Sequence, residues 1–352
     1  MKGTRREVIT SGLALGAAAP LLAMGSSGFA CIPRSADAET DFLLSYKGAL
    51  TAANSEQKIL TLGDRRFSCR TGARVNLPAA EDLPLVVALH GGTYTSRYFD
   101  IPGYSLMARA AALGIPVLAL DRPGYGQTPL LQNTDASLAR NAEILDRALA
   151  TLWERQGCGR AGILLIGHSI GGAVVIEIAA RQPRWPLLGI AISGIGLANA
   201  PDPTSASEAG RPSSMITVPP EAKDRIMFGE AGTFGKSVQS MSRVADAAMP
   251  LQEAIDIRSH WARTAFRLLA QVRVPVHYRQ GSQDKLWIVD REQVQIFAAA
   301  FSAAPHVDAD IIEGSGHCID FHRIGASFQL AQLSFALRSA FSKNYSRRDA
   351  VR

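Results

Sequence analysis

Short apolar runs alternate with longer amphipathic stretches along most of this chain. The apolar runs lie at 84–89, 115–120, 163–166, 187–192, 274–278 and 307–312. A strand of a buried parallel sheet is apolar on both faces and has this appearance. The stretches 98–113 and 136–155 instead place their apolar residues at helical spacing. Because strand–helix–strand units cross over right-handed, the alternation predicts an α/β fold, with a mostly parallel central β-sheet flanked by helices.

Two segments depart from this alternation. Residues 58–72 form two extended runs around a Gly-Asp pair, which predicts a hairpin. Residues 198–220 contain five prolines among Ser, Ala and Thr, and such a stretch is neither a central strand nor a long helix. Helical patterns follow it at 221–228 and 251–270 before the strands resume.

These departures predict how the chain is divided. We expect one core made of residues 39–197 and 269–342, with 198–268 inserted as a cap over the carboxyl edge of the sheet. Four of the seven methionines fall in the expected cap: Met215, Met227, Met241 and Met249. Methionine adapts to irregular apolar ligands. The cap methionines either line a substrate pocket or only pack the cap onto the core.

Composition and charge exclude several classes of protein. Hydrophobic residues make up 47% of the chain and charged residues 19%, which excludes a disordered chain. The formal net charge is +6. Basic residues outnumber acidic ones mainly in residues 1–38 and in a basic C-terminal tail at 343–352. Because the remainder is nearly neutral, no nucleic-acid partner is expected.

The first 38 residues have the layout of an export signal. Arg5 and Arg6 precede a short apolar stretch at 13–24, which Pro20 interrupts and which is too short to span a bilayer. Paired arginines before a weakly apolar stretch resemble a twin-arginine signal, and an ordinary secretory signal is the alternative. The sequence therefore predicts an exported protein, periplasmic or secreted, without a transmembrane span.

The processing of this signal decides which cysteines remain. A small-x-small site at 36–38 would release a chain that begins at Glu39. The alternative, lipid attachment at Cys31, lacks the bulky aliphatic residue of a good lipobox. The mature chain would keep Cys69, Cys158 and Cys318. Export permits one disulfide among these three, and three buried free thiols are the alternative.

The strongest chemical signal follows the run at 163–166. The chain continues there as Gly167-His168-Ser169-Ile170-Gly171-Gly172, and then as an Ala- and Val-rich helical stretch. A G-x-S-x-G element between a buried strand and a helix holds its Ser in a strained, exposed turn that side chains at the flanking positions would obstruct. The helix N-terminus also favours a developing anion. Ser169 is therefore predicted to be a nucleophile.

With this element the chain resembles the α/β-hydrolase superfamily, over nearly the whole mature chain. In that superfamily the nucleophile is followed by an acid and then by a histidine. Asp284, just past the fifth apolar run, and His317, in a Gly-rich loop after the sixth, stand at the corresponding places. The resemblance implies that His317 accepts the proton of Ser169 and that Asp284 holds the imidazole in the required tautomer.

Two other residues compete for these roles. His322 is a second histidine near the Gly-rich loop, and we interpret it as a packing or surface residue. Asp290 is a second acid, but it lies deeper in the next helical pattern. Arg122, in the turn 121–126, is interpreted as a structural residue that ties loops together.

The resemblance also implies an oxyanion hole made by the backbone N–H groups of Ile170 and Gly92. The sequence His90-Gly91-Gly92-Thr93 lacks the last glycine of an H-G-G-G pattern, so Thr93 is a rival donor. Residues that we expect to contact a substrate pocket are Thr93, Tyr94, His168, Met227 and Phe228.

A serine nucleophile with this acid and histidine implies cofactor-free acyl transfer to water. We expect a serine hydrolase that cleaves a carboxylic ester of a small to medium, largely apolar substrate through an acyl-enzyme. A lactone or a carbon–carbon bond of beta-diketone type is the alternative substrate for the same triad. No metal-ligand spacing and no dinucleotide-binding fingerprint occurs, so no metal or cofactor is expected. The oligomeric state stays open.

Overall fold

The computed structural model describes residues 55–71, 83–131, 136–157, 159–201 and 214–349. The expected export signal, Cys31 and Cys158 lie outside these residues, as does part of the expected cap.

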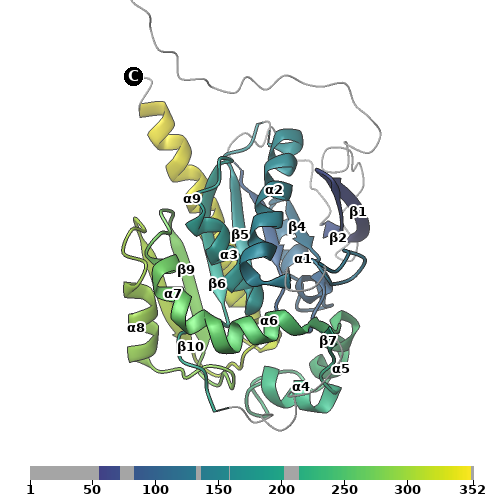
Figure 1. The fold of residues 1–352 in the computed structure, drawn as a ribbon. Coiled ribbons are helices and arrows are strands. Elements are labelled where there is room, and N and C mark those ends of the chain that lie inside the picture. Colours follow the sequence, from purple (N-terminus) through teal and green to yellow (C-terminus); the bar gives the residue numbers. More distant parts are fainter. Residues whose placement is uncertain (1–54, 72–82, 132–135, 158, 202–213, 350–352) are drawn as a thin grey trace, which may run out of the picture. The chain divides into compact units, whose positions relative to one another are not determined.

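Eight strands form one sheet in the order β1-β2-β4-β3-β5-β6-β9-β10 (Figure 1). Their bounds are β1 Glu56–Leu62, β2 Arg65–Thr71, β3 Leu85–Leu89, β4 Val117–Leu120, β5 Ile163–His168, β6 Leu187–Ser193, β9 Val276–Gly281 and β10 Val307–Ile312. All neighbours from β4 to β10 are parallel. The predicted hairpin supplies β1 and β2, which add antiparallel strands at one edge. The prediction of a mostly parallel sheet is confirmed.

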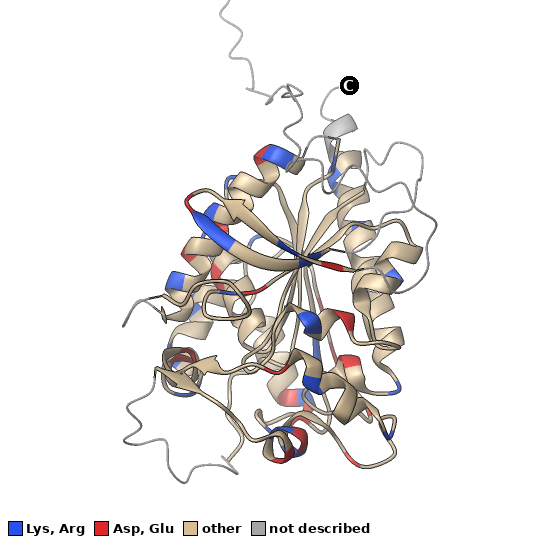
Figure 2. Cartoon of the chain, turned by 90° about the vertical axis from the view of Figure 1, so that its right-hand side faces the viewer, with Lys and Arg blue, Asp and Glu red and all other residues tan. Residues whose placement is uncertain are grey.

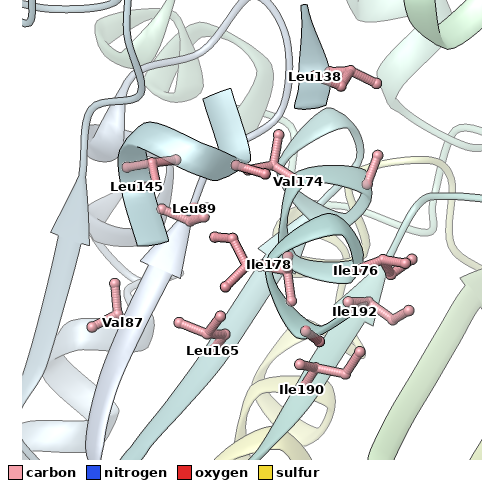
Figure 3. Close-up of a cluster of buried hydrophobic side chains, with 14 of the residues drawn as sticks. Val87, Leu89, Leu138, Leu145, Leu165, Val174, Ile176, Ile178, Ile190 and Ile192 are labelled. Carbon is pink, nitrogen blue, oxygen red and sulfur yellow. The ribbon is translucent and has the colours of Figure 1, made fainter. Parts of the chain in front are cut away.

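Helices cover both faces of this sheet (Figure 1). Their bounds are α1 Leu106–Ala112, α2 Leu138–Gln156, α3 Ile170–Ala180, α7 Trp261–Leu269, α8 Arg291–Ala299 and α9 Gly325–Asp349. Successive side chains of a strand point to opposite faces. Accordingly, Val87 and Leu89 of β3 pack with α2 and α3, as Figure 3 shows, whereas Val86 and Ala88 pack with residues of α1 and α9. The strands are therefore apolar on both sides, as the continuous runs predicted.

The helix predicted at 98–113 is divided. Residues Ser96–Asp100 form a 3-10 turn, and α1 begins six residues after it. Pro102 and Gly103 lie between the two, and Gly103 has φ +79°, so neither residue continues a helix. Ser105 then caps α1 by accepting a backbone N–H of the first turn at 2.9 Å.

Small elements form the cap between β6 and α7. They are β7 Met215–Ile216, α4 Pro220–Met227, α5 Val238–Ser242, β8 Met249–Pro250 and α6 Leu251–Ile255. Backbone hydrogen bonds join residues 245–247 of the cap to residues 93–95, which follow the end of β3. The cap therefore lies at the carboxyl edge of the sheet.

The helical pattern at 251–270 is present as α6 and α7 joined by a π-helical turn at Asp256–His260. Trp261 and Leu269 of α7 belong to the apolar cluster that includes α3. The boundary expected at 268 therefore falls inside a helix of the core layer, because this helix buries its apolar side against the core.

The C-terminal helix and the charge distribution complete the description. Helix α9 continues through Asp349, so the basic segment expected at 343–352 begins inside this helix. Acidic and basic residues are interspersed on the side of the molecule seen in Figure 2. Among the described residues, no helix has the length and apolar character needed to cross a membrane.

Candidate active site

Ser169 occupies the sharp turn between β5 and α3. Its backbone has φ 54° and ψ −124°, a conformation that costs a non-glycine residue about 1–3 kcal/mol. Strand β5 is buried along its whole length, and α3 begins at the next residue. Ser169 itself is partly exposed. The strained turn thus presents this serine at the carboxyl edge of the sheet.

Two glycines allow the turn to pack closely. A Cβ atom at Gly167 would lie 2.7 Å from the carbonyl oxygen of Gly171. A Cβ atom at Gly171 would lie 2.2 Å from the carbonyl oxygen of Leu89, at the end of β3. Both obstacles are backbone atoms of buried elements, so they have little freedom to move aside. The turn therefore requires glycine at both positions.

Asp284 and His317 form a buried pair. His317 Nδ1 lies 2.7 Å from Asp284 Oδ2, and the two side chains are 1% and 0% exposed. Asp284 also accepts hydrogen bonds from the Leu286 backbone N–H at 2.8 Å and from Gln280 Nε2 at 3.1 Å. Because the carboxylate is the acceptor, the neutral form of the His317 ring has its proton on Nδ1 and its lone pair on Nε2. This Nε2 is buried and has no hydrogen-bond partner in the described part of the chain.

The Ser169 turn lies close to this pair. The ring of His168 is 4.9 Å from the ring of His317, measured between centroids. A Cβ atom at Gly194 would lie 3.0 Å from His168 Cε1 and 3.1 Å from His317 Cε1. Ser169 donates its backbone N–H to the Ser193 carbonyl at 2.8 Å. The fold thus brings Ser169 and His317 close together at the carboxyl edge of the sheet, although β6 and β9 lie between the strands that they follow.

His168 fills the space behind the turn and is neutral. Its ring stacks on Tyr98, with centroids 4.6 Å apart and planes 8° apart. Its Nε2 lies 3.7 Å from Cys318 Sγ. Burial lowers the pKa of His168 well below its usual value, and the neighbouring His317 and His90 act in the same direction. His168 therefore adds no positive charge beside His317.

The residues predicted to supply the oxyanion donors pack against each other. A Cβ atom at Gly92 would be 3.0 Å from Ile170 Cδ1, and one at Gly91 would be 2.9 Å from Ser169 Cβ. The loop after β3 therefore packs directly on the Ser169 turn. Ile170 is the first residue of α3, so its N–H has no acceptor within the helix. Gly92 donates its N–H to no other backbone group among the described residues.

Arg122 holds this loop from the core side. Its Nε donates to the His90 carbonyl at 2.9 Å, and its Nη2 donates to the Gly91 carbonyl at 3.2 Å. The guanidinium also pairs with Glu253 of α6, with 2.5 Å between Nη1 and Oε1, and both side chains are fully buried. Arg122 therefore links the loop after β3 to the cap.

The residues expected to line a pocket pack mainly against other protein groups. Tyr94 and Phe228 are each 1% exposed, and Met227 is nearly as well buried. The carbonyl of Met227 accepts the N–H of Cys318, next to His317, at 3.0 Å. The end of α4 therefore supports the histidine loop. The sequence left open whether Met249 lines a pocket or packs the cap onto the core. Its side chain reaches the loop after β3, and its Sδ lies 2.5 Å from the position that a Cβ atom at Gly92 would take.

His322 has a role that sequence reasoning missed. Its Nε2 accepts the N–H groups of Gly229 at 3.0 Å and Gly316 at 2.9 Å, and its Nδ1 donates to the Cys318 carbonyl at 2.8 Å. Burial lowers the pKa of His322 and so favours the neutral ring that these bonds require. His322 is buried rather than on the surface, and no local motif marks it.

The remaining candidates are structural. Asp290 caps α8 by accepting the Gln293 N–H at 2.7 Å, so it is not the partner of His317. Cys69 and Cys318 are buried free thiols. Burial raises the pKa of the Cys318 thiol, which disfavours the nucleophilic thiolate. Within the described ranges, no group of three His, Cys, Asp or Glu side chains is arranged to hold a metal ion.

Known proteins are similar to this chain in sequence and in fold. A family model described as the alpha/beta hydrolase family matches residues 86–325. The chain belongs to this family. Protein phosphatase methylesterase 1 of Mus musculus is 26% identical to this alpha/beta hydrolase over 132 residues, which are 37% of this chain and 33% of the relative. Esterase P of Drosophila melanogaster is 30% identical over 139 residues, which are 38% of this chain and 25% of the relative.

These matches span a third or less of the length of either relative. Among solved structures, a putative lipase (lip1) from Acinetobacter baumannii AYE has a TM-score of 0.59 and 19% sequence identity. The similarity covers 83% of this alpha/beta hydrolase and 94% of that chain. At this identity the likeness establishes the fold, and the expected α/β-hydrolase fold is confirmed.

Proposed function

We propose that this alpha/beta hydrolase cleaves a carboxylic ester of a small to medium, largely apolar substrate through an acyl-enzyme on Ser169. The observation that carries the proposal is the unpartnered Nε2 of His317 beside the Ser169 turn, with Nδ1 bound to Asp284. The names of the two relatives, a methylesterase and an esterase, support the choice of an ester.

The first half of the reaction forms the acyl-enzyme. Ser169 Oγ attacks the ester carbonyl carbon while its proton passes to His317 Nε2. Asp284 stabilises the imidazolium, because its carboxylate already accepts the Nδ1 proton. The tetrahedral intermediate then collapses, the bond to the alcohol oxygen breaks, and the alcohol leaves with the proton from Nε2.

The second half releases the acid. Water attacks the acyl carbonyl and gives one proton to His317 Nε2. Collapse of the second tetrahedral intermediate breaks the bond to Ser169 Oγ, which takes that proton back. The N–H groups of Gly92 and Ile170 would bind the oxyanion in both halves, and one such donor contributes about 10²–10³ in kcat.

Apolar groups beside the proposed oxyanion hole support an apolar substrate. Met249 Sδ and Ile170 Cδ1 both lie against Gly92. These side chains offer dispersion contacts and no hydrogen bonds to a group bound over the loop. Methionine also adapts to substrates of irregular shape.

The test is hydrolysis of p-nitrophenyl esters with a range of acyl lengths, comparing the wild type with Ser169→Ala. Ser240→Ala, at an exposed serine of the cap, is the matched control. We expect turnover that falls by more than about a hundredfold in Ser169→Ala and stays unchanged in the control. A smaller loss would refute the mechanism. If the wild type hydrolyses none of these esters but Ser169 is still labelled by a fluorophosphonate, the result would favour a lactone or a beta-diketone as the substrate.

A further inference from the structure

The backbone of Thr93 is strained. Its φ is +60°, in the left-handed region that β-branched residues avoid. Such a conformation costs of order 1–3 kcal/mol and persists only where surrounding contacts hold it. Thr93 is buried and directly follows Gly92, the proposed oxyanion donor. The contacts that hold Thr93 therefore also fix the place of Gly92.

The cap supplies these contacts. The carbonyl of Thr93 accepts two hydrogen bonds, from Lys223 Nζ at 2.6 Å and from the Ala247 N–H at 3.0 Å. A neighbouring backbone bond runs from the Thr95 N–H to the Ala245 carbonyl at 2.8 Å. The loop after β3 is thus paired with a short extended piece of the cap, and Lys223 adds a charge-assisted bond.

Lys223 is built into this position. It lies in α4, its residue is 3% exposed, and its Nζ also donates to Asp246 Oδ1 at 2.5 Å. The same Nζ lies 3.3 Å from the ring centroid of Tyr94. Burying an ammonium group is costly unless it is paired and hydrogen-bonded. A carbonyl, a carboxylate and an aromatic face here offset that cost together.

Two buried cations therefore bind the carbonyl groups of one loop. Arg122 binds the carbonyls of His90 and Gly91 from the core, and Lys223 binds the carbonyl of Thr93 from the cap. Neither Gly92 nor Thr93 donates its N–H to another backbone group in the described part of the chain. The carbonyls of His90, Gly91 and Thr93 are thus occupied, while the N–H groups of Gly92 and Thr93 stay available to a ligand.

We propose that Lys223 is a positioning residue for the proposed ester hydrolysis, and the inference rests on that function. The cap lysine holds Thr93 in its left-handed conformation and so keeps Gly92 in place against the Ser169 turn. It touches no reacting atom. Its loss displaces an oxyanion donor, which weakens stabilisation of the transition state more than binding of the substrate.

The first test is Lys223→Met, which removes the charge and the donor and keeps an unbranched side chain. Lys236→Met makes the same change at an exposed cap lysine. We expect kcat of Lys223→Met to fall at least about tenfold with KM changed less than about threefold. The rate of inactivation by a phosphonate ester should fall in parallel, and Lys236→Met should match the wild type. A kcat within tenfold of the wild type in folded protein would overturn the inference.

A second experiment tests whether Lys223 acts through the backbone conformation of Thr93, by measuring the same substitution in a Thr93→Gly variant. Glycine adopts a positive φ without strain, so Thr93→Gly removes the need for a clamp. The loss of kcat caused by Lys223→Met should be at least about threefold smaller in the Thr93→Gly background. Equal losses in the two backgrounds would overturn the inference.

Two further results are decisive. If Lys223→Met does not fold, Asp246→Asn replaces it as the test. The Asp246 side chain is partly exposed, and its substitution removes only one of the partners of Lys223 Nζ. We expect kcat of Asp246→Asn to fall at least about threefold at constant KM, and an unchanged kcat would overturn the inference. A wild type that neither hydrolyses esters nor reacts with the phosphonate at Ser169 would overturn the proposed function and this inference together.

Discussion

Replacing Glu253 by Gln is expected to destabilise the protein severely. Glu253 and Arg122 are fully buried, and the pair joins the turn after β4 to helix α6. Tyr125 donates a further hydrogen bond to Glu253 Oε2 at 2.7 Å. The substitution Glu253→Gln keeps the size of the side chain but removes its charge. The guanidinium of Arg122 would then be buried without a counter-charge.

The size of the effect follows from this burial. Breaking a buried ion pair by removing one partner costs about 3–5 kcal/mol. Since the entropy of unfolding is about 2 cal/mol/K per residue, a domain of roughly 300 residues loses about 1.5–2 °C per kcal/mol, and Tm should fall by about 5–10 °C. Glu143→Gln is the matched control, because Glu143 is 33% exposed and pairs with Arg140 at 2.6 Å. An exposed pair contributes about 0–1 kcal/mol, so the control should lose only a few degrees.

Thermal unfolding of the two variants, followed by calorimetry, measures this difference. The double variant Arg122→Met/Glu253→Met separates stability from activity. Apolar replacement of a whole buried pair is often neutral, so Tm should largely recover. Ester hydrolysis should stay low, because the carbonyls of His90 and Gly91 would have lost the guanidinium. If Glu253→Gln melted as high as Glu143→Gln, the reasoning on buried charge would be refuted.

Two further predictions concern the elbow and acid stability. Gly171→Ala would place a Cβ atom 2.2 Å from the Leu89 carbonyl oxygen, so labelling of Ser169 by a fluorophosphonate should slow by about a hundredfold or more; unchanged labelling would contradict the packing argument. Burial, together with Arg279, lowers the pKa of His277 to about 4 from 6.5. The unfolded chain therefore takes up a proton first as the pH falls, and about 3 kcal/mol of stability is lost between pH 6.5 and pH 4. Urea unfolding at pH 7 and pH 5 should show a smaller loss for His277→Gln, and an equal loss in both proteins would speak against this assignment.

The residues proposed for the chemistry could be predicted from the sequence, because each of them follows the end of an apolar run that predicts a strand. Ser169 lies between glycines at the end of a buried run, and Asp284 and His317 follow the last two runs. The carboxyl ends of parallel strands meet at one edge of a sheet. Strand order alone therefore brings such residues together, and no knowledge of side-chain packing is required.

The buried charged residues that hold the loop after β3 could not be predicted in this way. Lys223 lies 130 residues from Thr93 in the chain, and Glu253 lies 131 residues from Arg122. A charged residue in a short helical pattern usually faces solvent. Only the tertiary fold shows that these two are buried, since their partners come from the core. Of the two interpretations of His322, packing is the one that the structure supports, but its three hydrogen bonds to backbone groups of two loops could not be read from the sequence.

The position of the histidine loop has a consequence for synthesis of the protein. The loop follows β10, the last strand made and an edge of the finished sheet. Its neighbour Cys318 touches His168 across 150 residues of chain. A nascent chain that has just completed α3 therefore carries the serine but has no imidazole beside it. Contacts between such distant residues are slow to form, because the entropy of closing a long loop must be overcome first. The proposed hydrolytic activity should therefore appear only after β10 and the histidine loop have been made and have packed against the Ser169 turn.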